Sequence, residues 1–264
     1  INRALAERDG PIAVLIAETG GQNAMFVDSS ALPEQVVLDS VYSAFNSAGQ
    51  RCSALRVLCV QEDIADRVVE LLVGHMDELV IGDPSLLATD VGPAIDQEAR
   101  AILEAHLAKM ENAATIVHRC ALDDAAEAGT FFAPTLIEID SLDVLEREVF
   151  GPVLHLLRFR GKDLEATIDA VNASGYGLTM GLHSRIDARA RSIAARSAAG
   201  NLYINRNMIG AVVGVQPFGG RGLSGTGPKA GGPHYLPRFG TEMTVSNNIA
   251  AVGGNASLLS LESE

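Results

Sequence analysis

The sequence has few cysteines, a shortage of positive charge and no long apolar run, and each shortage excludes a class of protein. Its three cysteines, Cys52, Cys59 and Cys120, have unpatterned spacing, which fits neither a disulfide framework nor a zinc site and favours a cytosolic protein. Lys and Arg number 20 against 33 Asp and Glu, a formal net charge of -13 that makes nucleic acids and anionic membranes poor partners. The longest apolar stretches, such as residues 13–17, fall far short of the ~20 residues that a membrane-spanning helix needs.

The composition that remains is that of an ordinary globular protein. Apolar residues make up 47% and charged residues 20%, which argues against disorder, collagen and low-complexity arrays. A length of 264 residues suggests one large domain or two small ones, at about 150 residues per domain, with a sizeable core. The chain opens on Ile1 with what reads as the charged end of a helix that stops at Gly10, so we expect further sequence upstream.

Short apolar runs alternate with amphipathic stretches of helical length, which is typical of an α/β architecture. Strands are predicted at residues 13–16, 55–60, 135–139, 153–159, 178–182 and 201–204. Apolar residues that recur every three to four positions predict helices at residues 32–49, 64–79, 99–112, 164–172 and 188–198.

The last quarter of the chain is rich in glycine and proline. Residues 219–232 predict an ordered loop, and residues 241–251 predict a strand or hairpin that pairs with another subunit because it has no face of its own to bury. Residues 220–225 match G-x-G-x-x-G in form. The dinucleotide fingerprint needs a strand before it and a helix after it, and neither is predicted here.

Cys52 is the first candidate for chemistry. It lies on a turn between a predicted helix and a predicted strand, where small neighbours leave room for a substrate and Arg51 supplies charge that favours a thiolate. The alternative is a buried structural cysteine, which is also how Cys59 and Cys120 are interpreted. The six histidines lack ligand spacing, so no metal site is predicted.

Glu18 is the second candidate. It follows the predicted strand at residues 13–17 and precedes Gly20 and Gly21, so it could act as a general base whose pKa is raised by apolar surroundings. The alternative is a solvated glutamate in a turn. Glu18 and Cys52 together indicate catalysis more strongly than either residue alone, because a thiol nucleophile and a carboxylate base suffice to make and hydrolyse a thioester.

Five motifs in order resemble the aldehyde dehydrogenase superfamily: ETGG at 18–21, QRC at 50–52, EVFGP at 148–152, YGLT at 176–179 and PFGG at 217–220. Within it, CSA at 52–54, IGAVVG at 209–214 and GGPHY at 231–235 resemble the glutamate-semialdehyde (pyrroline-5-carboxylate) dehydrogenases. Residues 250–259 resemble the C-terminal end of the bifunctional proline utilization A flavoenzymes. The resemblance implies NAD-dependent oxidation of glutamate semialdehyde to glutamate in proline catabolism.

The resemblance also implies roles for single residues. Cys52 would attack the aldehyde carbon, and Glu18 would activate the water that hydrolyses the thioester. Glu148 would bind the ribose next to the nicotinamide of NAD, with Phe150 packed nearby.

The substrate contacts that it implies are four. Ser53, Gly210 and Ala211 would anchor the substrate carboxylate through a hydroxyl and two backbone N–H groups, and Phe218 would cover the aliphatic part of the substrate.

The fold that the resemblance implies is the catalytic domain of the aldehyde dehydrogenase fold. Residues 1–20 would hold the last strand of the NAD-binding domain, residues 21–222 the catalytic domain, and residues 223–264 the Gly-rich loop and a C-terminal oligomerisation strand or hairpin. The N-terminal half of the enzyme is not in these residues, so we expect the chain alone to bind NAD weakly and to turn over slowly or not at all. The flavin domain is absent too, and no FAD is assigned.

Alternative functions remain open from the sequence. An aldehyde dehydrogenase for another substrate would share the motifs, and a coenzyme-A-acylating enzyme would share the nucleophile. Glu18 argues against acylation, because a hydrolytic base would waste the thioester. A non-catalytic fragment or scaffold is the alternative outside enzymes, and for it Cys52→Ala would change only stability.

Overall fold

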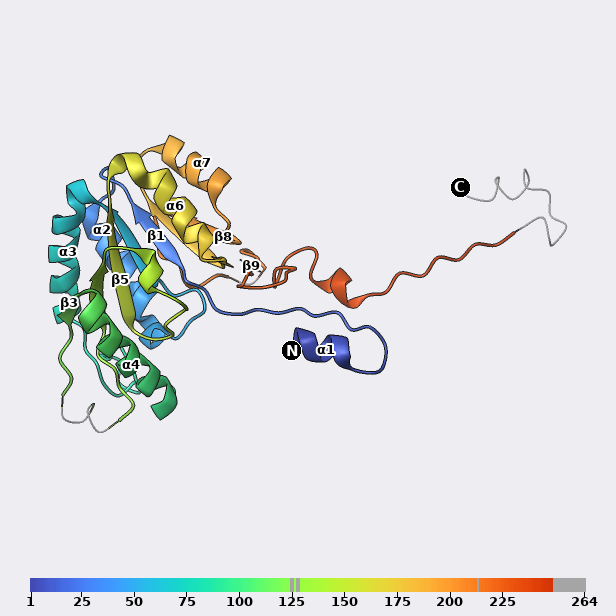
Figure 1. Cartoon of the computed structure of the whole chain (residues 1–264), viewed down its shortest axis with the longest axis horizontal. Helices are drawn as coiled ribbons and strands as arrows, with labels where there is room; N and C mark the ends of the chain where they lie inside the picture. The colour runs from blue at the N-terminus through green and yellow to red at the C-terminus, as the bar shows by residue number, and fades with distance from the viewer. Residues whose placement is uncertain (124–125, 127–128, 213, 249–264) are drawn as a thin grey trace. The chain divides into compact units, whose positions relative to one another are not determined.

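The computed structural model describes residues 1–123, 126, 129–212 and 214–248. Backbone contacts divide the chain into two units, residues 1–232 and residues 233–264. The first unit is an α/β domain around one seven-stranded sheet (Figure 1), which confirms the fold class expected from the sequence. The division falls inside the third predicted segment, and the predicted boundaries at residues 20 and 222 stay predictions.

The sheet has the strand order β3-β4-β5-β2-β1-β7-β8, and its neighbours run parallel except for β3 and β4. These strands are β1 (Ala24–Val27), β2 (Val57–Gln61), β3 (Thr115–Arg119), β4 (Thr135–Ile139), β5 (Val153–Phe159), β7 (Thr179–His183) and β8 (Asn201–Ile204). Two short strands, β6 (Tyr176–Gly177) and β9 (Arg221–Gly222), pair separately. Every residue of β1 is buried, as expected for the middle of a parallel sheet covered on both faces.

Helices cover both faces of this sheet. On one face α2 (Pro33–Phe45) and α3 (Glu62–Asp77) bury side chains spaced three to four residues apart, such as Val37 and Val41 of α2 and Leu72 and Met76 of α3. On the other face lie α4 (Gln97–Ala113), α6 (Leu164–Ala173) and α7 (Asp187–Arg196). The remaining helical segments are α1 (Asn2–Glu7), η1 (Asn46–Gly49), η2 (Leu142–Val144), η3 (Gly161–Asp163) and η4 (Leu236–Phe239).

The strand predicted at residues 13–16 is wrong. Residues 12–17 form no strand, and Ile12 and Val14 are exposed. Ala17 is bonded to a loop instead, since its carbonyl accepts from the Thr226 N–H and its own N–H donates to Thr226 Oγ1. The sheet takes its strand β1 from the next apolar run, which the sequence analysis missed together with β3.

The second unit is described over residues 233–248. It contains η4, where the rings of Tyr235 and Phe239 pack edge to face with centroids 5.3 Å apart. Residues 241–248 belong to no helix or strand, so within the described residues the predicted strand at 241–251 is not formed. The rest of that prediction, and the motif at 250–259, lie outside the described residues. Across the described ranges, no helix combines the length and apolarity needed to span a bilayer.

Candidate active site

Cys52 lies on a sharp turn that leads into β2. The turn follows η1, where Ser47 and Ala48 have φ of 56° and 51° and Gly49 has φ of 63°. A Cβ on Gly49 would lie 2.2 Å from the Gly151 carbonyl oxygen. The glycine therefore lets the nucleophile turn, residues 50–54, pack directly against the segment that carries Glu148.

A buried side chain that the sequence analysis missed fixes this turn. Asn23 donates through Nδ2 to the carbonyl oxygens of Cys52, at 2.7 Å, and of Ala54, at 2.8 Å. Its Oδ1 accepts from the Thr179 N–H at 3.1 Å, at the start of β7. Both N–H groups and the carbonyl oxygen of the amide are bonded to backbone, so Asn23 ties the turn to two neighbouring strands.

Five of the predicted site residues share one cavity of about 520 Å³. They are Cys52, Ser53, Gly210, Ala211 and Phe218. Gln50, Arg51, Gln216, Ala230 and Gly231 complete the lining. Gly210 has φ of 75°, and none of the described atoms lies within 4 Å of where its Cβ would be. Its backbone is thus open to the cavity and to a ligand inside it.

The thiol of Cys52 is exposed and held toward its protonated form. Partial burial raises its pKa, and the charges of Glu148 and Glu18 raise it further, against hydrogen bonds from the backbone of Ser53 and Cys52 that lower it. Arg51 is not among the groups whose charge shifts this pKa, so it does not supply the stabilising charge expected from the sequence; its Nε donates to Ser47 Oγ at 3.1 Å. Reaction of this thiol therefore needs its proton to be removed.

Glu18 lies beside the loop that carries Phe218. It is bridged to Gly225, and a Cβ on Gly219 would lie 3.0 Å from its Oε1. Burial raises the pKa of Glu18, opposed by a backbone hydrogen bond from Gly220 and by the charge of Lys229. Although Glu18 does not line the cavity itself, its charge acts on Cys52, so the two predicted groups lie in one neighbourhood.

The G-x-G-x-x-G match at residues 220–225 lies in this same loop. It contains the short strand β9, and residues 223–232 form no helix. The loop therefore lacks the strand-to-helix connection that a dinucleotide fingerprint requires.

Glu148 is fixed by the first motif and by a buried cation. Its Oε2 accepts from the Gly21 N–H at 3.1 Å, and its Oε1 accepts from Arg56 Nη2 at 3.2 Å. A Cβ on Gly20 would lie 1.8 Å from Oε2, which explains the glycine at that position. Burial raises the pKa of Glu148 and Arg56 lowers it. Phe150, two residues later, is 44% exposed and its ring faces Arg56 at 5.2 Å.

This carboxylate and this aromatic ring fit one end of a dinucleotide. A carboxylate held by two donors keeps lone pairs for ribose hydroxyls, and an exposed ring offers a face to a planar heterocycle. No group of three or more His, Cys, Asp or Glu side chains in the described part of the chain is arranged to hold a metal ion.

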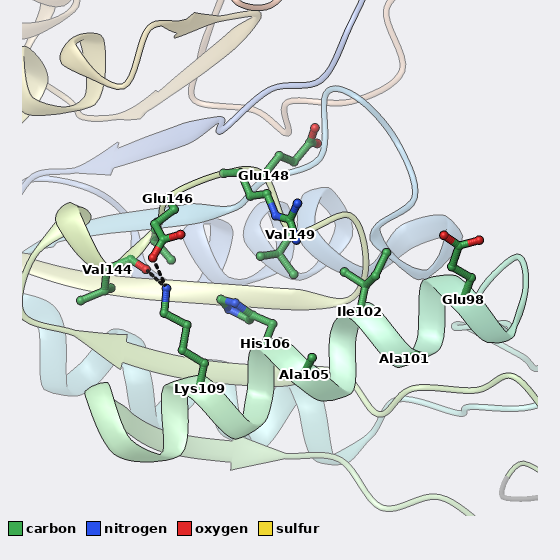
Figure 2. Close-up of a pocket in the computed structure, with 12 residues that line it drawn as sticks. Glu98, Ala101, Ile102, Ala105, His106, Lys109, Val144, Glu146, Glu148 and Val149 are labelled. Atoms are coloured by element: carbon green, nitrogen blue, oxygen red, sulfur yellow. Dashed lines mark hydrogen bonds and ion pairs between the residues drawn. The ribbon is translucent and has the colours of Figure 1, made fainter.

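A second cavity, of about 390 Å³, lies between α4 and residues 144–149 (Figure 2). His106 points into it, and Lys109 crosses it to Glu146 at 2.8 Å. His106 Nε2 lies 2.9 Å from Nε2 of the buried His155. The sequence analysis assigned these histidines no role and predicted no cavity here.

Comparison with known proteins points to one family. A sequence profile of the aldehyde dehydrogenase family matches residues 1–245. The bifunctional protein PutA of Rhizobium meliloti is 53% identical over 263 residues, which cover 98% of this chain and 22% of that protein. The 1-pyrroline-5-carboxylate dehydrogenase of Geobacillus kaustophilus is 37% identical over 234 residues, which cover 88% of this chain and 45% of that protein.

The fold is shared as well. A crystal structure of the bifunctional proline utilization A (PutA) protein matches with a TM-score of 0.91 and 59% identity, over 96% of this chain and 26% of that chain. The chain thus spans about a fifth of the length of the PutA relatives and about half the length of the dehydrogenase.

Proposed function

The chain belongs to the aldehyde dehydrogenase family, and on that premise we propose that it carries the thiol chemistry of an enzyme that oxidises L-glutamate γ-semialdehyde to L-glutamate in proline catabolism. The relatives named PutA and 1-pyrroline-5-carboxylate dehydrogenase support this substrate. The observation that carries the proposal is the cavity shared by Cys52, Ser53, Gly210, Ala211 and Phe218, within range of the Glu18 and Glu148 charges.

The first step is addition of Cys52 to the aldehyde. The exposed thiol gives its proton to water, Sγ bonds to the carbonyl carbon, and the carbonyl oxygen takes the electron pair of the broken π-bond. The backbone hydrogen bonds that lower the pKa of Cys52 come from Ser53 and Cys52 itself, so they stabilise the thiolate that attacks the aldehyde.

The last step is hydrolysis of the thioester on Cys52. Glu18 takes a proton from water, the oxygen attacks the acyl carbon, and the carbon–sulfur bond breaks to release the acid and the thiolate. The raised pKa of Glu18 supports this role, because a stronger base removes a proton from water more readily. Between the two steps, a nicotinamide dinucleotide, which we propose is NAD, would supply the two-electron acceptor, held by Glu148 and Phe150.

The substrate carboxylate would bind opposite the aldehyde. The Ser53 hydroxyl and the backbone N–H groups of Gly210 and Ala211 are its proposed donors, and the open backbone at Gly210 supports them. Phe218, on the same cavity wall, would cover the methylene groups.

Other parts of the proposal concern location and assembly. Three free thiols support a cytosolic setting. A homo-oligomer formed through the C-terminal tail is supported by exposed apolar side chains in the second unit, at Leu236, Phe239, Met243 and Val245. We propose that turnover needs the N-terminal half of the enzyme as well as these residues.

The test is product identity, measured on the protein encoded by the complete reading frame that contains these residues. Incubated with pyrroline-5-carboxylate and NAD, it should yield glutamate and reduced cofactor in equal amounts, and Cys52→Ala should yield neither. Glutamate formation that persists in Cys52→Ala would overturn the proposal. An acyl-CoA product in place of the free acid would favour the acylating alternative. Oxidation of other aldehydes but not of this one would assign a different substrate.

A further inference from the structure

Arg56 is a fully buried cation next to the candidate active site. It precedes β2, and only 2% of its side chain is exposed. A charge taken out of water costs several kcal/mol unless it is paired and hydrogen-bonded. Burial accordingly lowers the pKa of Arg56, and Glu148 opposes that shift.

Its guanidinium joins two segments that are far apart in the sequence. Nη2 donates to the Arg51 carbonyl oxygen and to Glu148 Oε1, each at 3.2 Å, and Nη1 donates to the Gly151 carbonyl oxygen at 2.9 Å. Arg51 precedes Cys52 in the nucleophile turn, and Glu148 is the proposed ribose ligand. Nε has no hydrogen-bond partner among the described residues, so the two terminal nitrogens make all of these contacts.

The backbone of Arg56 is fixed from both sides. Its N–H donates to the Asn23 carbonyl oxygen at 3.0 Å, and its carbonyl oxygen accepts from the His155 N–H at 2.9 Å. His155 Nδ1 lies 3.0 Å from the same oxygen, and its Nε2 meets His106. With its main chain held this way, the guanidinium has a defined position from which to hold Glu148.

The same geometry determines which charges act on the thiol of Cys52. The described groups whose charges act on Cys52 are Glu148, Glu18 and Arg56, and the two carboxylates raise the pKa of the thiol. Arg51 precedes Cys52 in the sequence but is not among the groups whose charge shifts the pKa of the thiol. Of the two carboxylates, Glu148 raises the pKa of Cys52 more, and Arg56 is in direct contact with Glu148.

We propose that Arg56 is a positioning residue that clamps the Glu148 carboxylate to the nucleophile turn, so that the cofactor contact and Cys52 are held in one geometry. The consequence for cofactor binding rests on the proposed function. The clamp itself, and its effect on the reactivity of Cys52, do not depend on the proposed function.

The first experiment measures the thiol alone. The rate of Cys52 alkylation by iodoacetamide is followed across pH by intact-protein mass in the 264-residue chain and in Arg56→Met, Arg56→Lys, Glu148→Gln and the Arg56→Met/Glu148→Gln double variant. Arg56→Met should lower the rate at about pH 8 by roughly threefold to tenfold, because each unit by which a thiol pKa rises cuts its thiolate about tenfold. Arg56→Lys keeps the charge, so its alkylation rate should lie between that of the parent and that of Arg56→Met.

The double variant separates the clamp from a general effect of the cation. If Arg56 acts through Glu148, then Arg56→Met should change the rate less than about twofold in the Glu148→Gln background. An equal effect in both backgrounds, or none in either, overturns the proposal. The matched control is Arg158→Met, which removes an arginine paired with Glu138 and Asp66 and should leave the Cys52 profile unchanged.

Folding is read from the same spectra. Because Cys59 and Cys120 are buried, their labelling would report an unfolded variant. If Arg56→Met proves unfolded, the variants Arg56→Lys and Glu148→Gln test the clamp in its place. If the pH profile of Cys52 alkylation is unchanged in both of them, the proposal is overturned.

The second experiment measures kinetics in the complete-reading-frame protein. Arg56→Lys should raise the KM for NAD several-fold more than the KM for the aldehyde, because the ribose ligand loses its second anchor. Equal changes in the two constants, or none, overturn the cofactor consequence. A protein that shows the thiol effect but oxidises no glutamate semialdehyde would refute the proposed function and leave the clamp standing.

Discussion

At the scale of the residue, the three cysteines differ in what surrounds their sulfur atoms. Cys52 is exposed, whereas burial raises the pKa of Cys59 to about 12 and that of Cys120 to about 11. Since only the thiolate reacts with alkylating agents, we predict that the folded chain takes up one label at about pH 8, at Cys52, with the other two slower by at least ~100-fold. Peptide mapping after brief alkylation identifies the site.

Cys52→Ala is the control for this prediction and should take up no label while folded. Denaturant should expose the remaining two thiols in that variant and all three in the parent. Early labelling of Cys59 in the folded parent would contradict the buried strand position that the structure gives it.

Residue identities in the site were predictable only where a motif carried them. The five cavity residues follow from short motifs, because they lie in three short segments of the chain. Asn23 and Arg56 were missed because their partners lie 29 and 92 residues away, and only the folded chain brings them together. One signal was present: a lone arginine within the apolar run at residues 54–60 must be buried and paired if that run forms a central strand.

At the scale of the element, Gly49 sets the approach of η1 to the segment before β5. Its φ of 63° is unfavourable for an L-residue, and a Cβ there meets the Gly151 and Ala44 carbonyl oxygens. We predict that Gly49→Ala lowers the free energy of unfolding by roughly 2–4 kcal/mol through strain and displaced backbone. Urea denaturation measures the change.

The control for this prediction is another glycine of the same chain. Gly74 lies inside α3, and none of the described atoms is within 4 Å of where its Cβ would be. Gly74→Ala should therefore stabilise the protein by roughly 0.5–1 kcal/mol through helix propensity. Equal effects of the two substitutions would show that the close packing at Gly49 is not significant for stability.

The contact between α4 and β5 contains two neutral histidines. His155 Nδ1 faces the Arg56 carbonyl and so carries the proton, which leaves its Nε2 to accept from His106 Nε2. Burial lowers the pKa of His106 to about 4 and that of His155 to about 3. Both lie below the ordinary value of 6.5, so the unfolded chain binds more protons as pH falls from 6.5 toward 4, and stability decreases over that window.

We predict that each histidine costs roughly 2 kcal/mol of stability between about pH 7.5 and about pH 5. His106→Gln keeps an N–H donor for His155 but does not titrate, so its unfolding free energy should fall less over this range, by about that amount. Urea titrations at the two pH values measure it. His234→Gln, an exposed position in the second unit, should follow the parent, and a His106→Gln variant with the parent's pH dependence would refute the neutral pair.

Most elements of the sheet and its helices were predictable because their apolar periods are strong. The predicted ranges 135–139, 153–159 and 201–204 coincide with β4, β5 and β8. The error at residues 13–17 arose because a five-residue apolar run reads as a strand wherever it lies, whereas β1 is only four residues long and follows polar residues. Which run enters a sheet depends on the strands that flank it, and local sequence does not contain that information.

At the scale of the whole molecule, the fold of the family is present, but the chain covers only part of the length of its relatives. The described residues have the α/β fold that is shared with solved structures of the aldehyde dehydrogenase family. They span 45% of the Geobacillus kaustophilus dehydrogenase. In the described part, G-x-G-x-x-G occurs only in the loop at residues 220–225, away from any strand-to-helix connection.

We therefore predict that the 264-residue chain retains a reactive Cys52 but turns over poorly. A dinucleotide owes much of its affinity to pyrophosphate contacts at a helix N-terminus, and poor placement of the reacting groups costs about 100-fold in rate. The expected rate of glutamate formation is below ~1% of that of the complete-reading-frame protein. Parallel assays at equal molar concentration, with Cys52 alkylation as the check on folding, measure the ratio. A comparable rate from both proteins would show that Glu148, Phe150 and the cavity residues suffice to bind and orient the dinucleotide.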